Sequence, residues 1–173
     1  MLKLEKLLER TCIMNTITYR KAVLEDSLEL AILKGQVWNT TYKGIYPDEK
    51  LTGYDVAKNE IIFQNIVNNP DIELYVALDR NKLVGLMTCG KPYRPFMDFQ
   101  QEIGLLYILK DYQRQGIGKV FFEIARKQVK EKGYTEFFLS VNSRNFDAQR
   151  FYEAMGGTIV FMDAAQIKYV YLV

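Results

Sequence analysis

The chain has 173 residues, of which 49% are hydrophobic and 25% charged, as expected for one globular domain that needs no disulfide or metal to hold its core. Lysine and arginine number 23 against 21 acidic residues, and a net charge of +2 gives no basis for a nucleic-acid or membrane partner. There is no histidine and there are only two cysteines, Cys12 and Cys89, which excludes a Ser-His-Asp triad, a His-based zinc site and Cys-rich metal clusters.

The amino-terminal residues carry no targeting pattern. Residues 1–12 are charged and leucine-rich, without the apolar core of an export signal, and no apolar run in the chain approaches the roughly 20 residues of a membrane span. We therefore expect a cytoplasmic protein and a single domain over residues 1–173. Residues 1–13 are interpreted as an N-terminal extension, which is either an extra amphipathic turn or the result of a start upstream of the true one.

Hydrophobic periodicity predicts a mixed α/β order, β-α-α-β-β-β-α-β-α-β-β. Alternating or continuous apolar patterns predict strands at residues 17–20, 72–78, 83–89, 102–109, 137–141, 158–162 and 168–172. Helical spacing predicts helices at residues 24–38, 56–69, 117–132 and 147–155. Residues 39–47 and 91–99 are expected to be loops, the second because it contains two prolines.

The segment that carries chemistry is residues 113–119, between an apolar strand and a long helix. The first turn of a helix has unpaired N–H groups and a partial positive charge, and Gly116 and Gly118 would let an anion approach those groups closely. Arg114 and Lys119 add charge beside it. The spacing fits neither a P-loop nor a dinucleotide-binding motif. The alternative is that the two glycines only shape a strand-to-helix turn.

The pattern Gln113-x-x-Gly116-x-Gly118 resembles the acyl-CoA signature of the GCN5-related N-acetyltransferase (GNAT) superfamily. Residues 145–157, with their Asn-x-x-Ala-x-x-Phe-Tyr and Gly-Gly pattern, are similar to that family's second motif, and the resemblance covers residues 17–173. It implies the GNAT fold, a central, mostly antiparallel mixed sheet flanked by about four helices, with a V-shaped splay between two parallel strands. It also implies acetyl-CoA (coenzyme A) as co-substrate and no metal.

The resemblance further implies a cofactor site along the splayed strands. Leu106 and Ile108 would offer backbone hydrogen bonds to the pantetheine, because splaying leaves backbone groups without strand partners. Asn145 matches a position whose side chain bonds the cofactor, although a helix cap is the alternative interpretation. The residues expected to hold the pyrophosphate are Arg114, Gln115, Gly116, Ile117, Gly118 and Lys119.

Two residues are candidates for the proton transfers, which without histidine must use Glu, Asp, Tyr, Lys, water or the substrate. Tyr152 matches the family's usual general acid, which would protonate the departing coenzyme A thiolate. Its alternative is an aromatic core residue beside Phe151. Glu102, at the start of the central strand, is the candidate base acting through water, with a solvated strand-end charge as its alternative. Ser140 stands where some protein N-terminal acetyltransferases carry a glutamate.

The acceptor pocket is expected from the variable loops, with Tyr42, Tyr46 and Tyr93 as walls, unless these are ordinary surface or packing aromatics. Cys89 is interpreted as a small strand hydrophobe. The predicted activity is direct transfer of an acetyl group from acetyl-CoA to a primary amine of a small molecule, in a ternary complex. Because dimers are common in the GNAT superfamily, the resemblance also implies a homodimer as a possible assembly. The alternatives are a non-catalytic acyl-CoA-binding or regulatory module, and a protein acetyltransferase acting on lysines or N-termini.

Overall fold

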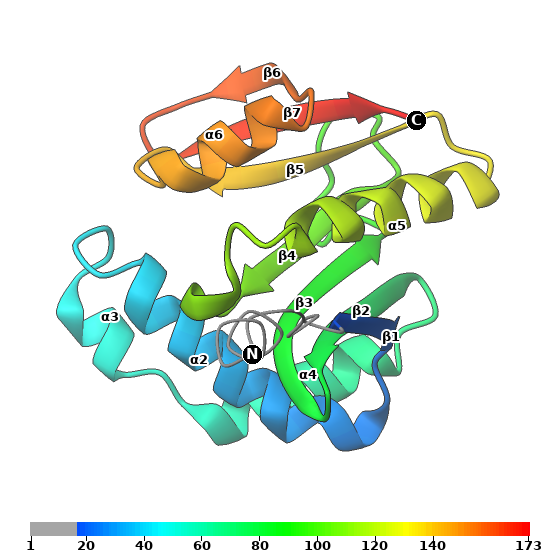
Figure 1. The fold of residues 1–173 in the computed structure, drawn as a ribbon. Coiled ribbons are helices and arrows are strands. Elements are labelled where there is room, and N and C mark those ends of the chain that lie inside the picture. The colour runs from blue at the N-terminus through cyan, green and yellow to red at the C-terminus, as the bar shows by residue number, and fades with distance from the viewer. Residues whose placement is uncertain (1–16) are drawn as a thin grey trace, which may run out of the picture.

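A seven-stranded sheet organises residues 17–173, which are the residues that the computed structural model describes (Figure 1). Its spatial order is β1-β2-β3-β4-β5-β7-β6. All neighbouring strands pair antiparallel except β4 and β5, which are parallel, so the predicted mixed, mostly antiparallel sheet is confirmed. The predicted extension at residues 1–13 lies outside the described residues. The strands are β1 (Ile17–Lys21), β2 (Ile72–Asp79), β3 (Lys82–Gly90), β4 (Glu102–Ile108), β5 (Glu136–Asn142), β6 (Thr158–Met162) and β7 (Gln166–Leu172).

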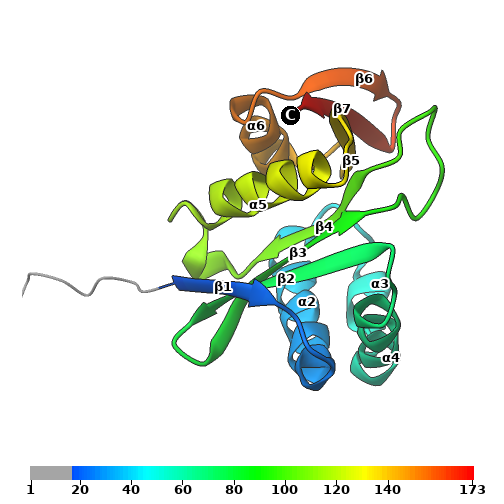
Figure 2. The same cartoon turned by 90° about the vertical axis from the view of Figure 1, so that its right-hand side faces the viewer.

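Helices cover both faces of this sheet (Figure 2). They are α2 (Ser27–Thr41), α3 (Asp48–Thr52) and α4 (Val56–Val67) on one face and α5 (Ile117–Glu131) and α6 (Phe146–Ala154) on the other, with 3-10 turns η1 (Leu24–Asp26) and η2 (Lys110–Tyr112). The helix predicted from residue 24 begins as the 3-10 turn, because the Asp26 carboxylate accepts the Val23 N–H and pairs with Arg20. The short helix α3 was not predicted, since five residues carry no readable period.

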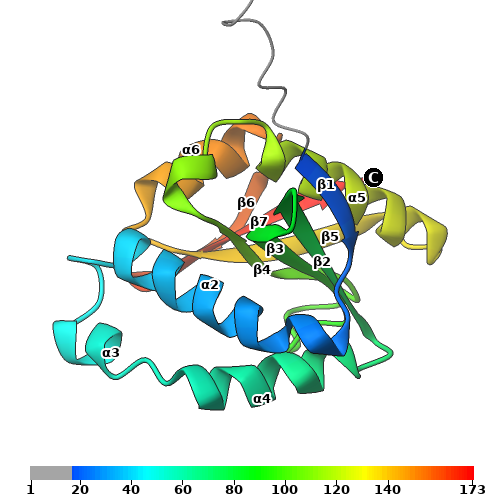
Figure 3. The same cartoon turned by 60° about the horizontal axis from the view of Figure 1, so that its bottom comes forward.

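The two faces have separate cores of different character. Beneath α2 and α4, which run side by side in Figure 3, the core is mainly aliphatic. Beneath α5 and α6 it is aromatic, and Phe122 is fully buried at its centre. The Phe122 ring contacts the rings of Phe137, Phe151, Tyr152 and Tyr171 at centroid distances of 5.0 to 6.1 Å. This cluster fixes α6 against α5 and the sheet, and so positions Tyr152.

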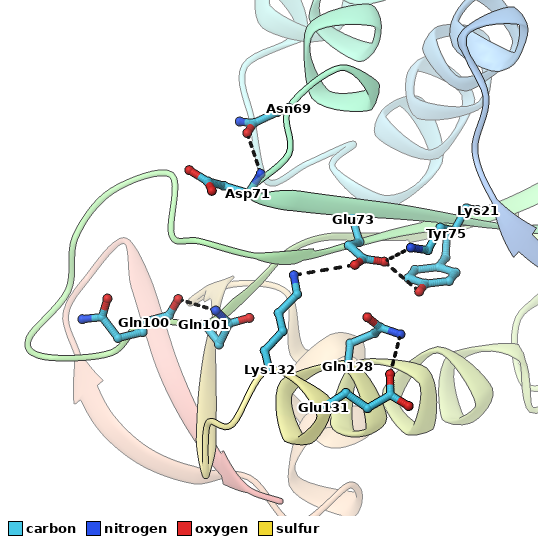
Figure 4. Close-up of polar contacts among 10 residues, drawn as sticks. All are labelled: Lys21, Asn69, Asp71, Glu73, Tyr75, Gln100, Gln101, Gln128, Glu131 and Lys132. Carbon is cyan, nitrogen blue, oxygen red and sulfur yellow. Dashed lines mark hydrogen bonds and ion pairs between the residues drawn. The ribbon is translucent and has the colours of Figure 1, made fainter.

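The carboxyl-terminal end of α5 is held to the sheet by Glu73 of β2 (Figure 4). The carboxylate lies 2.7 Å from Lys21 Nζ and 3.7 Å from Lys132 Nζ, and accepts a hydrogen bond of 2.9 Å from the Tyr75 hydroxyl. Burial acts to raise the pKa of Glu73, but the Lys21 and Tyr75 hydrogen bonds outweigh it and hold that pKa below its ordinary value. The helix is therefore anchored at the end opposite residues 113–119.

Truncating the central ring of the aromatic core should cost much of the protein's stability. We expect Phe122→Ala to lower the free energy of unfolding by about 3–5 kcal/mol, because the cavity it leaves is lined by rings that cannot all move inward. Urea denaturation followed by circular dichroism measures this. Glu123→Ala, an exposed change on the same helix, is the matched control and should shift stability by no more than about 0.5 kcal/mol. A similar loss in both variants would contradict the central role of Phe122.

Candidate active site

A β-bulge in β4 sets the geometry of the site. Thr88 of β3 pairs with Leu105 but the next residue, Cys89, pairs with Ile103, so Gly104 is an extra residue in β4. The Leu105 N–H donates to the Thr88 side-chain hydroxyl at 2.8 Å. A bulge bends its strand and increases the local twist. The bulge therefore turns β4 away from its parallel neighbour β5.

The two parallel strands separate immediately beyond this bulge. β4 and β5 pair only at Glu102 with Phe138 and at Ile103 with Leu139. Figure 1 shows β4 and β5 diverging from there. A cleft of about 1470 Å³ opens between them, and its walls include the rest of β4, the start of α5, the end of β5 and α6. The predicted V-shaped splay is thus confirmed. On this edge the backbone of β4 has no strand partner beyond Ile103, which leaves it available to a ligand with amide groups.

Gly116 forms the turn at the end of the cleft where the sequence predicts phosphate binding. It is the N-cap of α5 with a φ of +87°, a left-handed conformation that glycine adopts without the Cβ clash of other residues. Arg114 also has a positive φ, of +62°. A Cβ built on Gly116 would meet nothing within 4 Å, so the space before the helix N-terminus is open. Gln113 ties the turn to β4 by donating its side-chain N–H to the Ile108 carbonyl at 3.0 Å.

The other predicted phosphate residues take different positions. Gly118 lines the cleft, but a Cβ there would lie 2.8 Å from Phe151 Cζ, so this glycine is needed for packing between α5 and α6. Ile117 is fully buried in the core. The Gln115 side chain donates to the Asp111 carbonyl at 2.7 Å and is outside the cleft lining. The side chains of Gln115 and Ile117 are therefore not placed to contact a bound anion, and these two residues could contribute only backbone groups.

The electrostatics of the cleft favour an anion. Its charged lining residues, within the described part of the chain, are Lys110, Arg114, Lys119, Arg144 and Arg150, opposed by Asp147. Most of these cations stand around the helix N-terminus of α5 and the first turn of α6, and cations next to a helix N-terminus reinforce its attraction for phosphate groups.

Asn145 and Tyr152 come from α6 and both line the cleft. Asn145 is the N-cap of this helix, and its side-chain oxygen accepts the Ala148 N–H at 3.2 Å. The capping interpretation therefore holds for the oxygen, while the amide nitrogen of the same side chain carries two donors. Tyr152 is 7% exposed, and burial raises the pKa of its phenol. A buried phenol stays protonated at neutral pH, which suits a proton donor.

Glu102 lies at the closed end of the V, beside but outside the cleft lining. Its carboxylate accepts the backbone N–H of Tyr93 at 3.1 Å. Burial raises the pKa of Glu102, although the Tyr93 hydrogen bond and the charge of Lys168 act against the shift. The Tyr93 side chain itself is 86% exposed and does not line the cleft, so the structure does not bring this predicted substrate residue to the site.

The opposite wall of the cleft is made of aromatic residues after α2. The rings of Tyr42 and Tyr46 stack at 4.8 Å, both line the cleft, and Trp38 packs on the pair. Sequence reasoning missed Tyr107 of β4, which lines the same wall and whose hydroxyl accepts the Trp38 indole N–H at 3.2 Å. The sequence did contain a signal for Tyr107. Tyr107 lies between Leu106 and Ile108 in a strand, so its side chain projects from the face opposite to theirs.

Arg144 was also missed, and it joins the two walls of the cleft. Its guanidinium donates to the carbonyls of Gly44 at 2.7 Å and Ile45 at 3.1 Å. These bonds connect the turn before α6 to the loop after α2, which lie on the same side of Figure 1. A contact between residues 100 apart in the chain leaves no local sequence pattern.

Other classes of site find little support in this geometry. Among residues 17–173, no group of three or more carboxylate, thiol or imidazole side chains is placed to bind a metal ion. Within the same residues, no helix combines the length and apolarity needed to cross a membrane. Cys89 is buried in β3, and burial raises the pKa of its thiol to about 12, so it is not a nucleophile at neutral pH.

The fold, the splayed strands and the glycine turn are those of one enzyme family. The family model described as "Acetyltransferase (GNAT) family" matches residues 37–157. This range contains the bulge, most of the residues that line the cleft, the turn at Gly116 and Tyr152. The chain therefore belongs to the GNAT family, and it is an N-acetyltransferase.

Two of three similar proteins cover most of the chain, and the third covers about half of it. An uncharacterised N-acetyltransferase, YuaI of Bacillus subtilis, is 25% identical over 158 residues, which span 90% of this chain and 88% of that protein. N-alpha-acetyltransferase 30 of Schizosaccharomyces pombe is 29% identical over 82 residues, 47% of this chain and 55% of its own. The crystal structure of PaiA N-acetyltransferase from Thermoplasma acidophilum in complex with coenzyme A superposes with a TM-score of 0.81 and 25% identity, over 91% of this chain and 99% of that one.

The left-handed turn at Gly116 gives a direct test of the phosphate site. Gly116→Ala forces an L-residue into a conformation that costs about 1–2 kcal/mol, so the turn should relax and coenzyme A should bind about tenfold more weakly or worse. Gly133→Ala is the matched control, because Gly133 has a φ of +82°, an equally open Cβ position and a place outside the cleft lining. Isothermal titration with coenzyme A, alongside thermal melts, compares the two. Unchanged affinity in a folded Gly116→Ala protein would contradict the phosphate assignment.

Proposed function

We propose that this N-acetyltransferase transfers an acetyl group from acetyl-CoA directly to the primary amine of a small molecule. One observation carries the proposal. A single cleft joins a cationic, left-handed turn before α5 to a buried phenol, Tyr152, and then to an aromatic wall on the other face of the sheet. These three parts correspond to what a pyrophosphate, a thioester and an uncharged amine need from a protein.

Acetyl-CoA is the proposed acyl donor. The turn at Gly116 with Arg114 and Lys119 would hold the pyrophosphate, and the open edge of β4 at Leu106 and Ile108 would hydrogen-bond the pantetheine amides. The structure of the Thermoplasma acidophilum relative, which contains coenzyme A, supports the same donor here. Asn145 would contribute its amide nitrogen from the far side of the cleft.

The proposed chemistry divides the proton transfers between two residues. The amine attacks the thioester carbonyl, the C–S bond breaks and the phenol of Tyr152 gives its proton to the departing thiolate. Burial keeps that phenol protonated until the thiolate forms. Glu102 would receive the amine's proton through water, because its carboxylate stands beside the cleft rather than in its lining.

The acceptor is proposed to be small because Arg144 ties the two walls of the cleft together. Its two bonds hold the loop after α2, at Gly44 and Ile45, against the turn before α6, and we expect this link to limit the access of a peptide chain. A protein N-terminus remains the second candidate acceptor, since one relative is an N-alpha-acetyltransferase. A non-catalytic acyl-CoA-binding module would have no use for the phenol at the thioester.

Titration with acetyl-CoA followed by a thiol-release screen tests the function. The panel should contain polyamines, amino acids, aminoglycosides and peptides with free N-termini or lysines. Micromolar binding with turnover on one small-amine class is the expected result. Turnover only on peptides would overturn the small-molecule acceptor, and failure to bind acetyl-CoA would overturn the proposal as a whole.

Removing one hydroxyl separates the acid role from packing. We expect Tyr152→Phe to lower kcat about 100-fold, the range of a lost general acid, with little change in the Kd for acetyl-CoA. Tyr169→Phe is the control. Tyr169 is also buried, its hydroxyl donates to the Glu153 carboxylate at 3.2 Å, and the residue lies outside the cleft lining. Steady-state kinetics on the amine found in the screen gives the comparison. Equal kcat values for the two variants would show that Tyr152 is only a core residue.

A further inference from the structure

A lysine of the protein itself contacts Ser140, a residue that lines the closed end of the cleft. Lys168 of β7 pairs with Ser140 of β5, and Phe138 pairs with Val170. Residues 137, 139 and 141 of β5 are buried against α5 and α6, so Phe138 and Ser140 project from the opposite face of the sheet. Lys168 projects from that face too, since its Nζ donates to Ser140 Oγ at 2.6 Å.

The Lys168 ammonium sits in surroundings that suit an amine. Its Nζ lies 4.7 Å from the ring centroid of Phe96 and 5.1 Å from that of Phe138, distances typical of cation–π contacts. The carboxylates of Glu102 and Asp163 act on it electrostatically. Burial lowers the pKa of Lys168, and these two carboxylates oppose the shift. Carboxylate, hydroxyl and aromatic faces thus surround one primary amine.

We infer that this amine lies close to the position where a bound thioester would end. β4 runs from the paired position Ile103 toward the phosphate turn, so a donor anchored at Gly116 reaches along β4 to the bulge. Gly104 and Ser140 are the first residues beyond the last strand pair, and both line the cleft. The hydroxyl to which Lys168 donates is therefore at the apex of the V, next to the position of the acyl group.

We propose that Lys168 is a site of intramolecular acetylation by acetyl-CoA bound in the same molecule. The inference rests on the proposed use of acetyl-CoA. The neutral Nζ attacks the thioester carbonyl carbon, a C–N bond forms and the C–S bond breaks. The amine loses one proton to Glu102 or water, and coenzyme A leaves as a thiolate that takes a proton from Tyr152. The products are N-acetyl-lysine at position 168 and free coenzyme A.

The experiment uses the full-length protein and deuterated acetyl-CoA, so that acetyl groups gained in the test differ in mass from any gained during expression. Acetylation of Lys168 blocks tryptic cleavage there and yields residues 151–173 as one peptide. Counting the deuterated and the undeuterated acetyl groups together gives the total fraction of Lys168 that is acetylated. Lys127, whose side chain is 72% exposed, reports the background of uncatalysed acetylation in the same digest.

We expect Lys168 to be acetylated at least about tenfold faster than Lys127, because the bound thioester is at high effective concentration. The rate should not depend on protein concentration, which distinguishes reaction within one molecule from reaction between two. Gly116→Ala should lower labelling of Lys168 without changing labelling of Lys127. Lys168→Arg, which keeps the charge, should abolish the residue 151–173 peptide.

Two results would overturn the inference, and they differ in what they say about the proposed function. If the protein binds acetyl-CoA and acetylates an added amine while total acetyl on Lys168 stays at the level of Lys127, the inference fails and the function stands. Equal labelling of Lys168 in wild type and in Gly116→Ala would likewise overturn the inference, because the labelling would then be uncatalysed. If calorimetry shows no acetyl-CoA binding, the inference and the function fail together.

Discussion

The single extra residue in β4 is the constraint on which the site depends. The extra residue Gly104 shifts the register of β4 against β3 and bends β4, and the pairing of β4 with β5 stops after two positions. A Cβ on Gly104 would lie 3.2 Å from Thr88 Oγ1, the atom that accepts the Leu105 N–H, so a small residue suits the bulge. Opening a sheet is costly because backbone groups lose their partners. The helices on each face hold it open, and a ligand with peptide-like amides would restore the missing bonds.

The two ends of the cleft follow from different physics. At the end near Gly116, where we propose that the phosphates bind, charge dominates, with a helix N-terminus and several cations meeting at one turn. At the proposed acceptor end, Tyr42, Tyr107 and Tyr152 line the cleft and burial raises the pKa of each phenol. Their hydroxyls are therefore neutral donors at physiological pH. Burial among neutral groups would favour the uncharged form of an amine, which is the form that attacks a thioester.

Local patterns in the sequence predicted the elements and the turn at Gly116, since strand and helix periods and the glycine turn depend on near neighbours. Gly116 and Tyr152 were selected because each lies in a short motif with its own spacing, and both line the cleft, while their functional roles stay predictions. The bulge at Gly104 and the bonds from Arg144 to Gly44 were not, because each depends on partners far along the chain. Gly118 shows the same limit, as its partner Phe151 gives it a packing role that the motif does not reveal. Tyr93 was selected as a loop aromatic, and loop composition does not determine which way a ring points.

The closed end of the V couples Glu102, the proposed base, electrostatically to Lys168. Glu102 is buried enough for its pKa to rise, and the Lys168 ammonium is one of two influences that hold it down. An acceptor ammonium arriving beside Ser140 would compete with Lys168 for the same carboxylate and the same aromatic faces. Acetylation of Lys168 would replace that ammonium with a neutral amide, remove its influence on Glu102 and fill the apex. Acyl transfer to an added amine and acyl transfer to Lys168 would thus be mutually exclusive uses of one position, and the balance between them would depend on whether acceptor is present.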